Sequence, residues 1–159
     1  MEIKSSFSPE EWARVVSAPM LAGIAITAAD PGGLWGALKE SAAAAGQIAK
    51  GGDDGLVGEI VTEYKTSDGR AIARTALKTE VKGKKPAEIV DSALAELSEV
   101  ADLVAMKNAE AGAAYKAWLL ETAKKVAEAG TEGGFMGFGG VKVSDSEKAT
   151  LEKLASALA

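Results

Sequence analysis

The chain has 159 residues, which is enough for one domain with a substantial hydrophobic core. It contains no cysteine and no histidine, which removes disulfides, thiolate and imidazole chemistry, and the usual zinc, copper and haem ligands. The balance of 18 basic to 23 acidic residues gives a formal net charge of −5 and argues against a nucleic-acid-binding surface.

Four local signals predict where the first helix begins. They are an N-cap, a proline at the first helical position, a capping-box acid and a hydrophobic staple, at Ser8, Pro9, Glu11, and Phe7 with Trp12. We expect this helix to run to about Ala29 and to bend near Pro19, because proline removes a helical donor.

The N-terminal segment carries no recognisable targeting signal, since it is acidic where a secretory peptide needs a basic start. The longest uncharged run, residues 15–29, contains Pro19 and Gly23. It is also shorter than the roughly 20 apolar residues that a membrane-spanning helix needs. We therefore expect a soluble, cytoplasmic protein without a membrane span.

The next segments predict two further helices and leave one region ambiguous. Asp30 can cap a second helix, and Asp53 or Asp54 can cap a third. Residues 59–79 can form a hairpin that turns at residues 67–69, given the β-branched residues before the turn. Helical spacing within this region favours two helices joined at Ser67–Asp68 instead, and the residues that show it are Ile72, Thr75, Ala76 and Thr79.

From residue 86 to residue 129 the apolar positions keep helical spacing. A single helix of this length would extend about 66 Å, too long for one small domain. We expect a break within residues 106–112, where Asn108 can cap a second helix that ends at Gly130. Five acids on the first of these helices fall within an arc of about 140°: Glu88, Asp91, Glu96, Glu99 and Asp102. We interpret this arc as a solvated face, with a basic partner or a loosely held divalent ion as alternatives.

Ser144 and Glu147 form a capping box that opens a final helix through Leu158. Together these patterns predict an all-α fold, with residues 1–159 in a single-domain bundle of about seven helices. A Gly/Phe-rich loop precedes the last helix, at residues 133–140.

This loop lacks the lysine and Ser/Thr of a phosphate-binding loop, so we expect no nucleotide site there. Its large apolar side chains, Phe135, Met136 and Phe138, either plug the open end of the bundle or face a partner. Ordering glycines is entropically costly, and burial of the two phenylalanines can offset that cost. We predict an ordered apolar lid that partly contacts a protein partner or a second copy of the chain.

Two segments resemble bacterial TerB-like, tellurite-resistance-type proteins, over roughly a quarter of the chain. IAITAADPGG, residues 24–33, resembles that family's apolar helix ending in an Asp–Gly step, and residues 140–158 resemble its closing helix. The resemblance implies a small helical bundle with an acidic divalent-metal surface. Asp30 matches one acidic step of that surface, whereas Gly139–Gly140 stand where the other acid is expected.

The functional prediction is a non-catalytic interaction or scaffold protein of the bacterial cytoplasm, a stress-related role included. We do not expect an enzyme, because nucleophile-and-base arrangements lack histidine and cysteine here. We expect no tightly bound cofactor. The first alternative is a weak Ca²⁺- or Mg²⁺-binding protein that uses Asp30, Asp53 and Asp54. The second is a carrier of an apolar ligand between helices.

Overall fold

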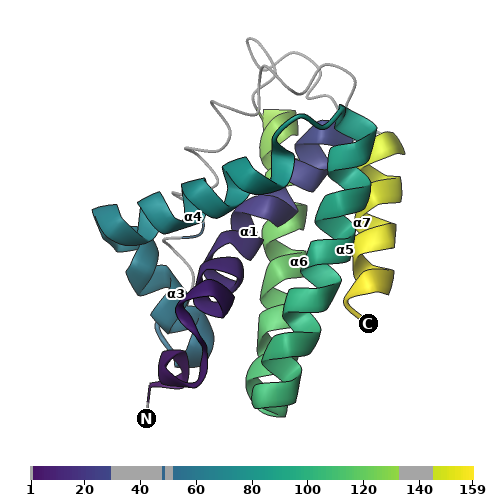
Figure 1. Ribbon diagram of the computed structural model, residues 1–159. Helices are drawn as coiled ribbons and strands as arrows, with labels where there is room; N and C mark the ends of the chain where they lie inside the picture. Colours follow the sequence, from purple (N-terminus) through teal and green to yellow (C-terminus); the bar gives the residue numbers. More distant parts are fainter. Residues whose placement is uncertain (1, 30–47, 49–51, 133–144) are drawn as a thin grey trace.

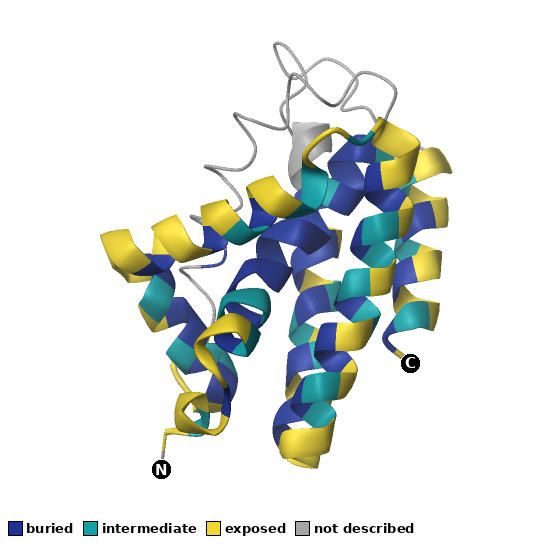
Figure 2. Ribbon diagram, in the orientation of Figure 1, coloured by how far each residue is buried: buried dark blue, intermediate teal, exposed yellow. Residues whose placement is uncertain are grey.

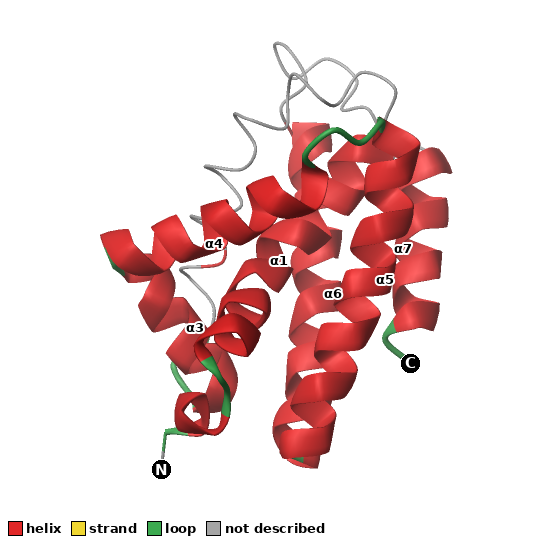
Figure 3. Ribbon diagram, in the orientation of Figure 1, coloured by secondary structure: helices red, strands yellow, loops and turns green. Residues whose placement is uncertain are grey.

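The computed structural model describes residues 2–29, 48, 52–132 and 145–159 (Figure 1). These residues form six α-helices and one short 3₁₀ helix, and they contain no strand (Figure 3). The elements are η1 (Ile3–Ser6), α1 (Pro9–Ala29), α3 (Gly55–Lys65), α4 (Ser67–Val81), α5 (Pro86–Lys107), α6 (Ala109–Glu132) and α7 (Asp145–Ala157). The all-α prediction is confirmed. The helix predicted after Asp30, and the loop at residues 133–140, lie outside the described residues.

Helix α1 lies in the middle of the bundle, with α3 and α4 on one side and α5, α6 and α7 on the other (Figure 1). It is buried all round from Val15 to Ala28, apart from half-buried Ile24 (Figure 2). A helix that is apolar on every side is typical of a protein core. By length and composition α1 could also cross a membrane, but 78% of its most apolar stretch is buried inside the structure.

The predicted start of α1 is confirmed in detail. The backbone N–H of Ser8 donates to Glu11 Oε2 at 2.8 Å, and the backbone N–H of Glu11 donates to Ser8 Oγ at 3.2 Å, which is a capping box. The rings of Phe7 and Trp12 have centroids 5.9 Å apart, as a hydrophobic staple requires. These local contacts explain why the helix begins at Pro9.

Residues 59–79 form parts of two helices, so the hairpin alternative is wrong. The junction lies at Thr66, one residue before the predicted Ser67–Asp68 step. Thr66 Oγ1 accepts the backbone N–H of Gly69 at 2.9 Å and so caps α4. A threonine cap favours the start of a new helix over the turn of a hairpin.

The predicted break before α6 is confirmed, because Asn108 Oδ1 accepts the backbone N–H of Ala111 at 3.0 Å. The predicted stop at Gly130 is wrong, since α6 continues to Glu132. A glycine inside a helix costs only about 1 kcal/mol relative to alanine, which the rest of α6 can tolerate. Close to the break, α5 and α6 approach so tightly that a Cβ on Gly112 would lie 2.7 Å from Ala105 Cβ.

Candidate functional site

The acidic residues predicted to bind a cation are not gathered in the described part of the chain. Asp53 is 90% exposed and lies 3.8 Å from Lys65 Nζ, and Asp54 is the exposed N-cap residue of α3. Asp30 lies outside the described residues. Among the residues that are described, no group of three or more acidic side chains is placed to hold a metal ion. Weak Ca²⁺ or Mg²⁺ binding stays a prediction from the sequence.

The predicted interaction residues Phe135, Met136 and Phe138 also lie outside the described residues. The choice between a core plug and a contact surface therefore stays open. Ser144, the predicted cap of the last helix, lies outside them too, whereas α7 itself is present from Asp145 to Ala157. Other parts of the structure must identify a candidate site.

The acidic arc of α5 is partly neutralised by bases from neighbouring helices. Arg14 of α1 donates Nε to Glu96 Oε1 at 2.6 Å and Nη2 to Glu96 Oε2 at 2.9 Å, and its Nη2 also lies 3.0 Å from Glu99 Oε2. The hydrogen bonds to Glu96 raise the pKa of Arg14. Lys116 of α6 lies 3.4 Å from Asp102. The arc therefore helps to join α5 to α1 and α6, and it is not only a solvated face.

Two tyrosine hydroxyls bind the backbone of α1 inside the core. Tyr115 donates to the carbonyl oxygen of Val15 at 2.8 Å, and Tyr64 donates to the carbonyl oxygen of Val16 at 2.5 Å. Burial raises the pKa of both phenols, and for Tyr115 the nearby Tyr64 and Glu96 raise it further. Both phenols are neutral hydrogen-bond donors at physiological pH, and their role is to hold α1 in place.

A serine, a lysine and a glutamate meet where α4 leads into α5, a cluster that the sequence interpretation missed. Lys84 Nζ donates to Ser92 Oγ at 2.7 Å and lies 3.3 Å from Glu80 Oε1, and Ser92 Oγ donates to the same carboxylate. These contacts link Glu80, Lys84 and Ser92 and so tie the α4–α5 turn together.

Helix α4 carries a row of basic residues that is the clearest candidate for a functional surface. The row, called here the α4 ridge, repeats every four residues and consists of Arg70, Arg74, Lys78 and Lys82. All four side chains are exposed, and in the described part of the chain none of them forms an ion pair. Of the other described basic residues, six form ion pairs, namely Lys4, Arg14, Lys65, Lys84, Lys107 and Lys116, and five exposed ones do not, namely Lys85, Lys124, Lys125, Lys148 and Lys153. The ridge differs from these five in its regular repeat along one helix.

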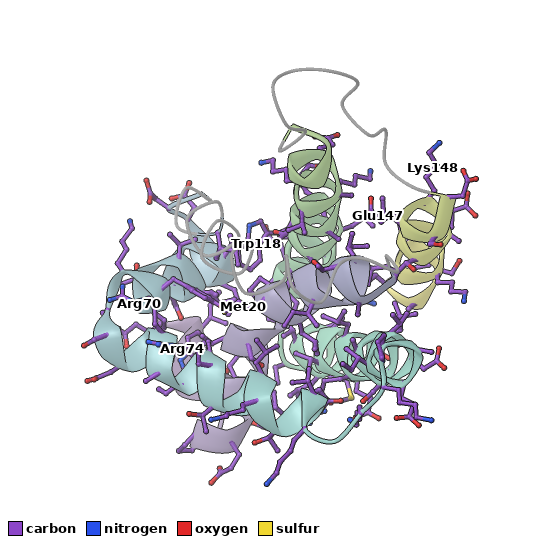
Figure 4. All side chains as sticks on the ribbon, turned by 90° about the horizontal axis from the view of Figure 1, so that it is seen from above. Met20, Arg70, Arg74, Trp118, Glu147 and Lys148 are labelled. Atoms are coloured by element: carbon purple, nitrogen blue, oxygen red, sulfur yellow. The ribbon has the colours of Figure 1, made fainter. Side chains whose placement is uncertain are left out.

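The two arginines of the ridge are held by backbone carbonyls. Arg70 Nη1 donates to the carbonyl of Tyr64 at 2.9 Å, and Arg74 Nε donates to the carbonyl of Arg70 at 3.3 Å. Figure 4 shows both arginines along α4. These contacts restrict each guanidinium while leaving further N–H donors for a ligand.

The ridge is not explained by the stability of α4 itself. Like charges four residues apart destabilise a helix by about 0.2–0.5 kcal/mol per pair, and α4 contains two such pairs, Arg70 with Arg74 and Arg74 with Lys78. Lys78 and Lys82 lie near the C-terminal end of α4, where the helix dipole favours cations. Arg70 lies near the N-terminal end, where the dipole disfavours them.

Three uncharged exposed residues of α4, called here the α4 strip, are Ile72, Thr75 and Thr79. At about 100° per residue, Ile72 lies about 160° around the helix from Arg70 and Arg74, so the strip adjoins only the Lys82 end of the ridge. Ile72 is 39% exposed, although it is a large apolar residue. A third face of α4, formed by Gly69, Ala73 and Leu77, is buried against the rest of the bundle. Helix α4 thus presents one face to the core and two distinct faces to solvent.

Comparisons with protein-family models, with curated proteins and with solved structures found no match. The likeness to TerB-like proteins therefore stays a resemblance of two short segments.

Proposed function

We propose that this chain is a non-catalytic helical interaction protein whose contact surface is the exposed side of α4. The observation that supports the proposal is the α4 ridge, in which four exposed cations have no ion-pair partner within the described residues. In a chain with a net charge of −5, carboxylates are plentiful, yet none of the described ones pairs with the ridge. The ridge is therefore available to an external anionic group.

The packing of α4 against the rest of the bundle also supports a binding role. Its buried face packs on the core, and Gly69 is close-packed, since a Cβ there would lie 2.2 Å from the carbonyl oxygen of Glu63. The ridge arginines are further restrained by the carbonyls of Tyr64 and Arg70. A surface that is already ordered loses less entropy on binding, so its contacts translate more fully into affinity.

The proposal keeps the interaction or scaffold role expected from the sequence and assigns it to a different surface. The apolar lid at residues 133–140, a stress-related role and a cytoplasmic location stay predictions from the sequence. The same holds for the two alternatives, weak binding of a divalent cation and transport of an apolar ligand. No contact among the described residues favours either alternative over the α4 surface.

Site-specific photo-crosslinking in an extract of the source organism tests the proposal. A photoreactive residue at Thr75, beside the ridge, should give discrete crosslinked products, whereas one at exposed Ala113 of α6 should not. The products should disappear in Arg70→Glu/Arg74→Glu. They should persist in Lys124→Glu/Lys125→Glu, which changes the net charge equally on exposed residues of α6. Products that form equally at both positions, or that ignore the ridge substitution, would contradict the proposal.

A further inference from the structure

We propose that residues 2–6, called here the strap, form a two-ended clasp that opens and closes while the helices stay folded. The strap contains η1, which lies beside α3 at the end of the molecule marked N in Figure 1. One end of the strap is bound by α3 and the other by α5. The clasp involves no residue of the α4 ridge.

The α3 end of the strap is held by two carboxylates. Glu59 Oε1 accepts the backbone N–H of Ile3 at 2.8 Å, and Glu59 Oε2 accepts the backbone N–H of Lys4 at 2.7 Å. Glu63 accepts a hydrogen bond from Lys4 Nζ, and its Oε1 lies 3.2 Å from the indole nitrogen of Trp12, which donates to it. A carboxylate offers an acceptor oxygen to each of two adjacent N–H groups, whereas an amide offers only one. Glu59 is therefore the latch of this end.

The α5 end of the strap is held by one lysine. Lys107 Nζ donates to the backbone carbonyl oxygen of Ser6 at 2.7 Å and lies 3.0 Å from Glu11 Oε2 of α1. The same nitrogen lies 5.2 Å from the centre of the Phe7 ring, within the range of a cation–π contact. Helix α3 packs mainly on α4, α6 and η1 rather than on α5. The strap thus joins two helices that otherwise have little contact with each other.

The strap has the properties of a segment that opens locally. None of its residues is buried, and its contribution to the core is limited to half-buried Ile3. The helices that it joins are anchored far more deeply, since Ile60 of α3 and Val104 of α5 are fully buried. Segments with few buried apolar contacts and exposed backbone hydrogen bonds have the lowest free energies of local opening. The strap contacts therefore break before the helices separate.

Opening of the strap changes the surroundings of Trp12 at the start of α1. Lys4 Nζ lies 5.4 Å from the centre of the Trp12 ring, and Trp12 is only 5% exposed while the strap is closed. Departure of Lys4 uncovers that face of the ring. It also leaves the carboxylates of Glu59 and Glu63 without their partners in the strap. The clasp therefore controls access to a large apolar side chain and two charged groups.

Limited digestion of the full chain with trypsin measures the opening, because the Lys4–Ser5 bond lies inside the strap. Cleavage there releases residues 1–4, which mass spectrometry detects. The cleavage rate follows the population of the open form when opening is fast. The Lys116–Ala117 bond inside α6 is the internal reference, and it should stay intact on the same timescale. Cleavage in the strap should be nearly independent of urea below the unfolding transition, since local opening exposes little surface.

Two substitutions, each with a matched control, test the two ends of the clasp. Glu59→Gln should raise the initial rate of cleavage at Lys4–Ser5 at least about fivefold, because one backbone N–H loses its acceptor. Lys107→Gln should raise the same rate about two- to fivefold, although it acts on the other end of the strap. The controls Glu152→Gln and Lys153→Gln change exposed residues of α7 and should each alter the rate by less than about 1.5-fold.

Three results would overturn the clasp. A cleavage rate that Glu59→Gln leaves unchanged would mean that the segment opens without a latch. An effect of Glu59→Gln without any effect of Lys107→Gln would mean that the two ends open independently. A steep rise of the rate with urea would mean that opening requires unfolding of the helices. If circular dichroism shows that Glu59→Gln is unfolded, Lys107→Gln and its control carry the test.

Discussion

Tyr115 of α6 donates its hydroxyl hydrogen to the backbone carbonyl oxygen of Val15 in α1, over a distance of 2.8 Å. Val15 lies four residues before Pro19, and proline has no N–H with which to satisfy that carbonyl. The phenol thus supplies the donor that the proline removes. Helix α1 continues through Pro19 to Ala29. Tyr115 and Val15 are both fully buried in the core.

Tyr115→Phe should leave the Val15 carbonyl without its donor. An unpaired buried carbonyl costs about 1–3 kcal/mol, so the free energy of unfolding in urea should fall by that amount. Pro19→Ala restores a backbone N–H four residues after Val15. In that background the same tyrosine substitution should cost about 1 kcal/mol less. If Tyr115→Phe lowers stability equally in the protein with Pro19 and in the Pro19→Ala variant, the hydroxyl does not replace the backbone donor that Pro19 lacks.

The buried phenols should make the protein less stable in alkali. The chain has two tyrosines, Tyr64 and Tyr115, and burial raises the pKa of each above its ordinary value. The stability that these neutral phenols contribute is fully present below the unfolded-state pKa of about 10. It is lost as pH rises further, because the phenols of the unfolded chain release their protons before those of the folded chain do. Phenolate absorbance should appear together with unfolding. A phenolate signal with an ordinary midpoint in the folded protein would contradict this.

The two carboxylates that contact Arg14 should differ in their contributions. Glu96 accepts two donors and its side chain is 21% exposed, whereas Glu99 accepts one and is 70% exposed. Glu96→Ala should lower the free energy of unfolding by about 1 kcal/mol, after allowance for solvent around the half-exposed arginine. Glu99→Ala should change it by less than about 0.5 kcal/mol. Chemical denaturation of both variants makes the comparison, and a larger loss for Glu99→Ala would overturn it.

Gly112→Ala should destabilise the protein, although alanine is the better helix former by about 1 kcal/mol. The added Cβ would lie 2.6 Å from Ala105 Cα and 2.7 Å from Ala105 Cβ, so α5 and α6 would have to move apart. Overpacking of this kind costs about 1–3 kcal/mol, measurable as a lower Tm. Ala105→Gly removes one of the two contacts and should restore part of the loss. A higher Tm for Gly112→Ala would show that the helices separate freely.

Local signals in the sequence were sufficient to predict several helix starts. Ser8 and Glu11 lie three residues apart, and Asn108 caps the backbone N–H of Ala111, so each pair interacts within a single turn. The all-α class follows from such signals together with helical periodicity. The end of α6 could not be predicted in the same way, because a glycine near a helix terminus permits the helix to end there but does not force it to.

Contacts between distant residues could not be predicted from the sequence. The Val15 carbonyl and the Tyr115 hydroxyl are separated by 100 residues, and Arg14 is separated from Glu96 by 82. Nothing in a one-dimensional pattern pairs them. The α4 ridge differs, since its spacing of four residues is visible in the sequence. It was overlooked because the net charge is negative, and because its exposure depends on which face of α4 packs on the core.

The burial of α1 has a consequence for synthesis on the ribosome. Helix α1 is made before α5 and α6, and much of its cover comes from these two later helices. At about 5–20 residues per second, several seconds pass between the emergence of Ala29 and that of Tyr115. During that interval α1, which by length and composition could cross a membrane, lacks the cover that α5 and α6 later provide. The order of these helices along the chain therefore predicts that α1 needs protection from aggregation during synthesis.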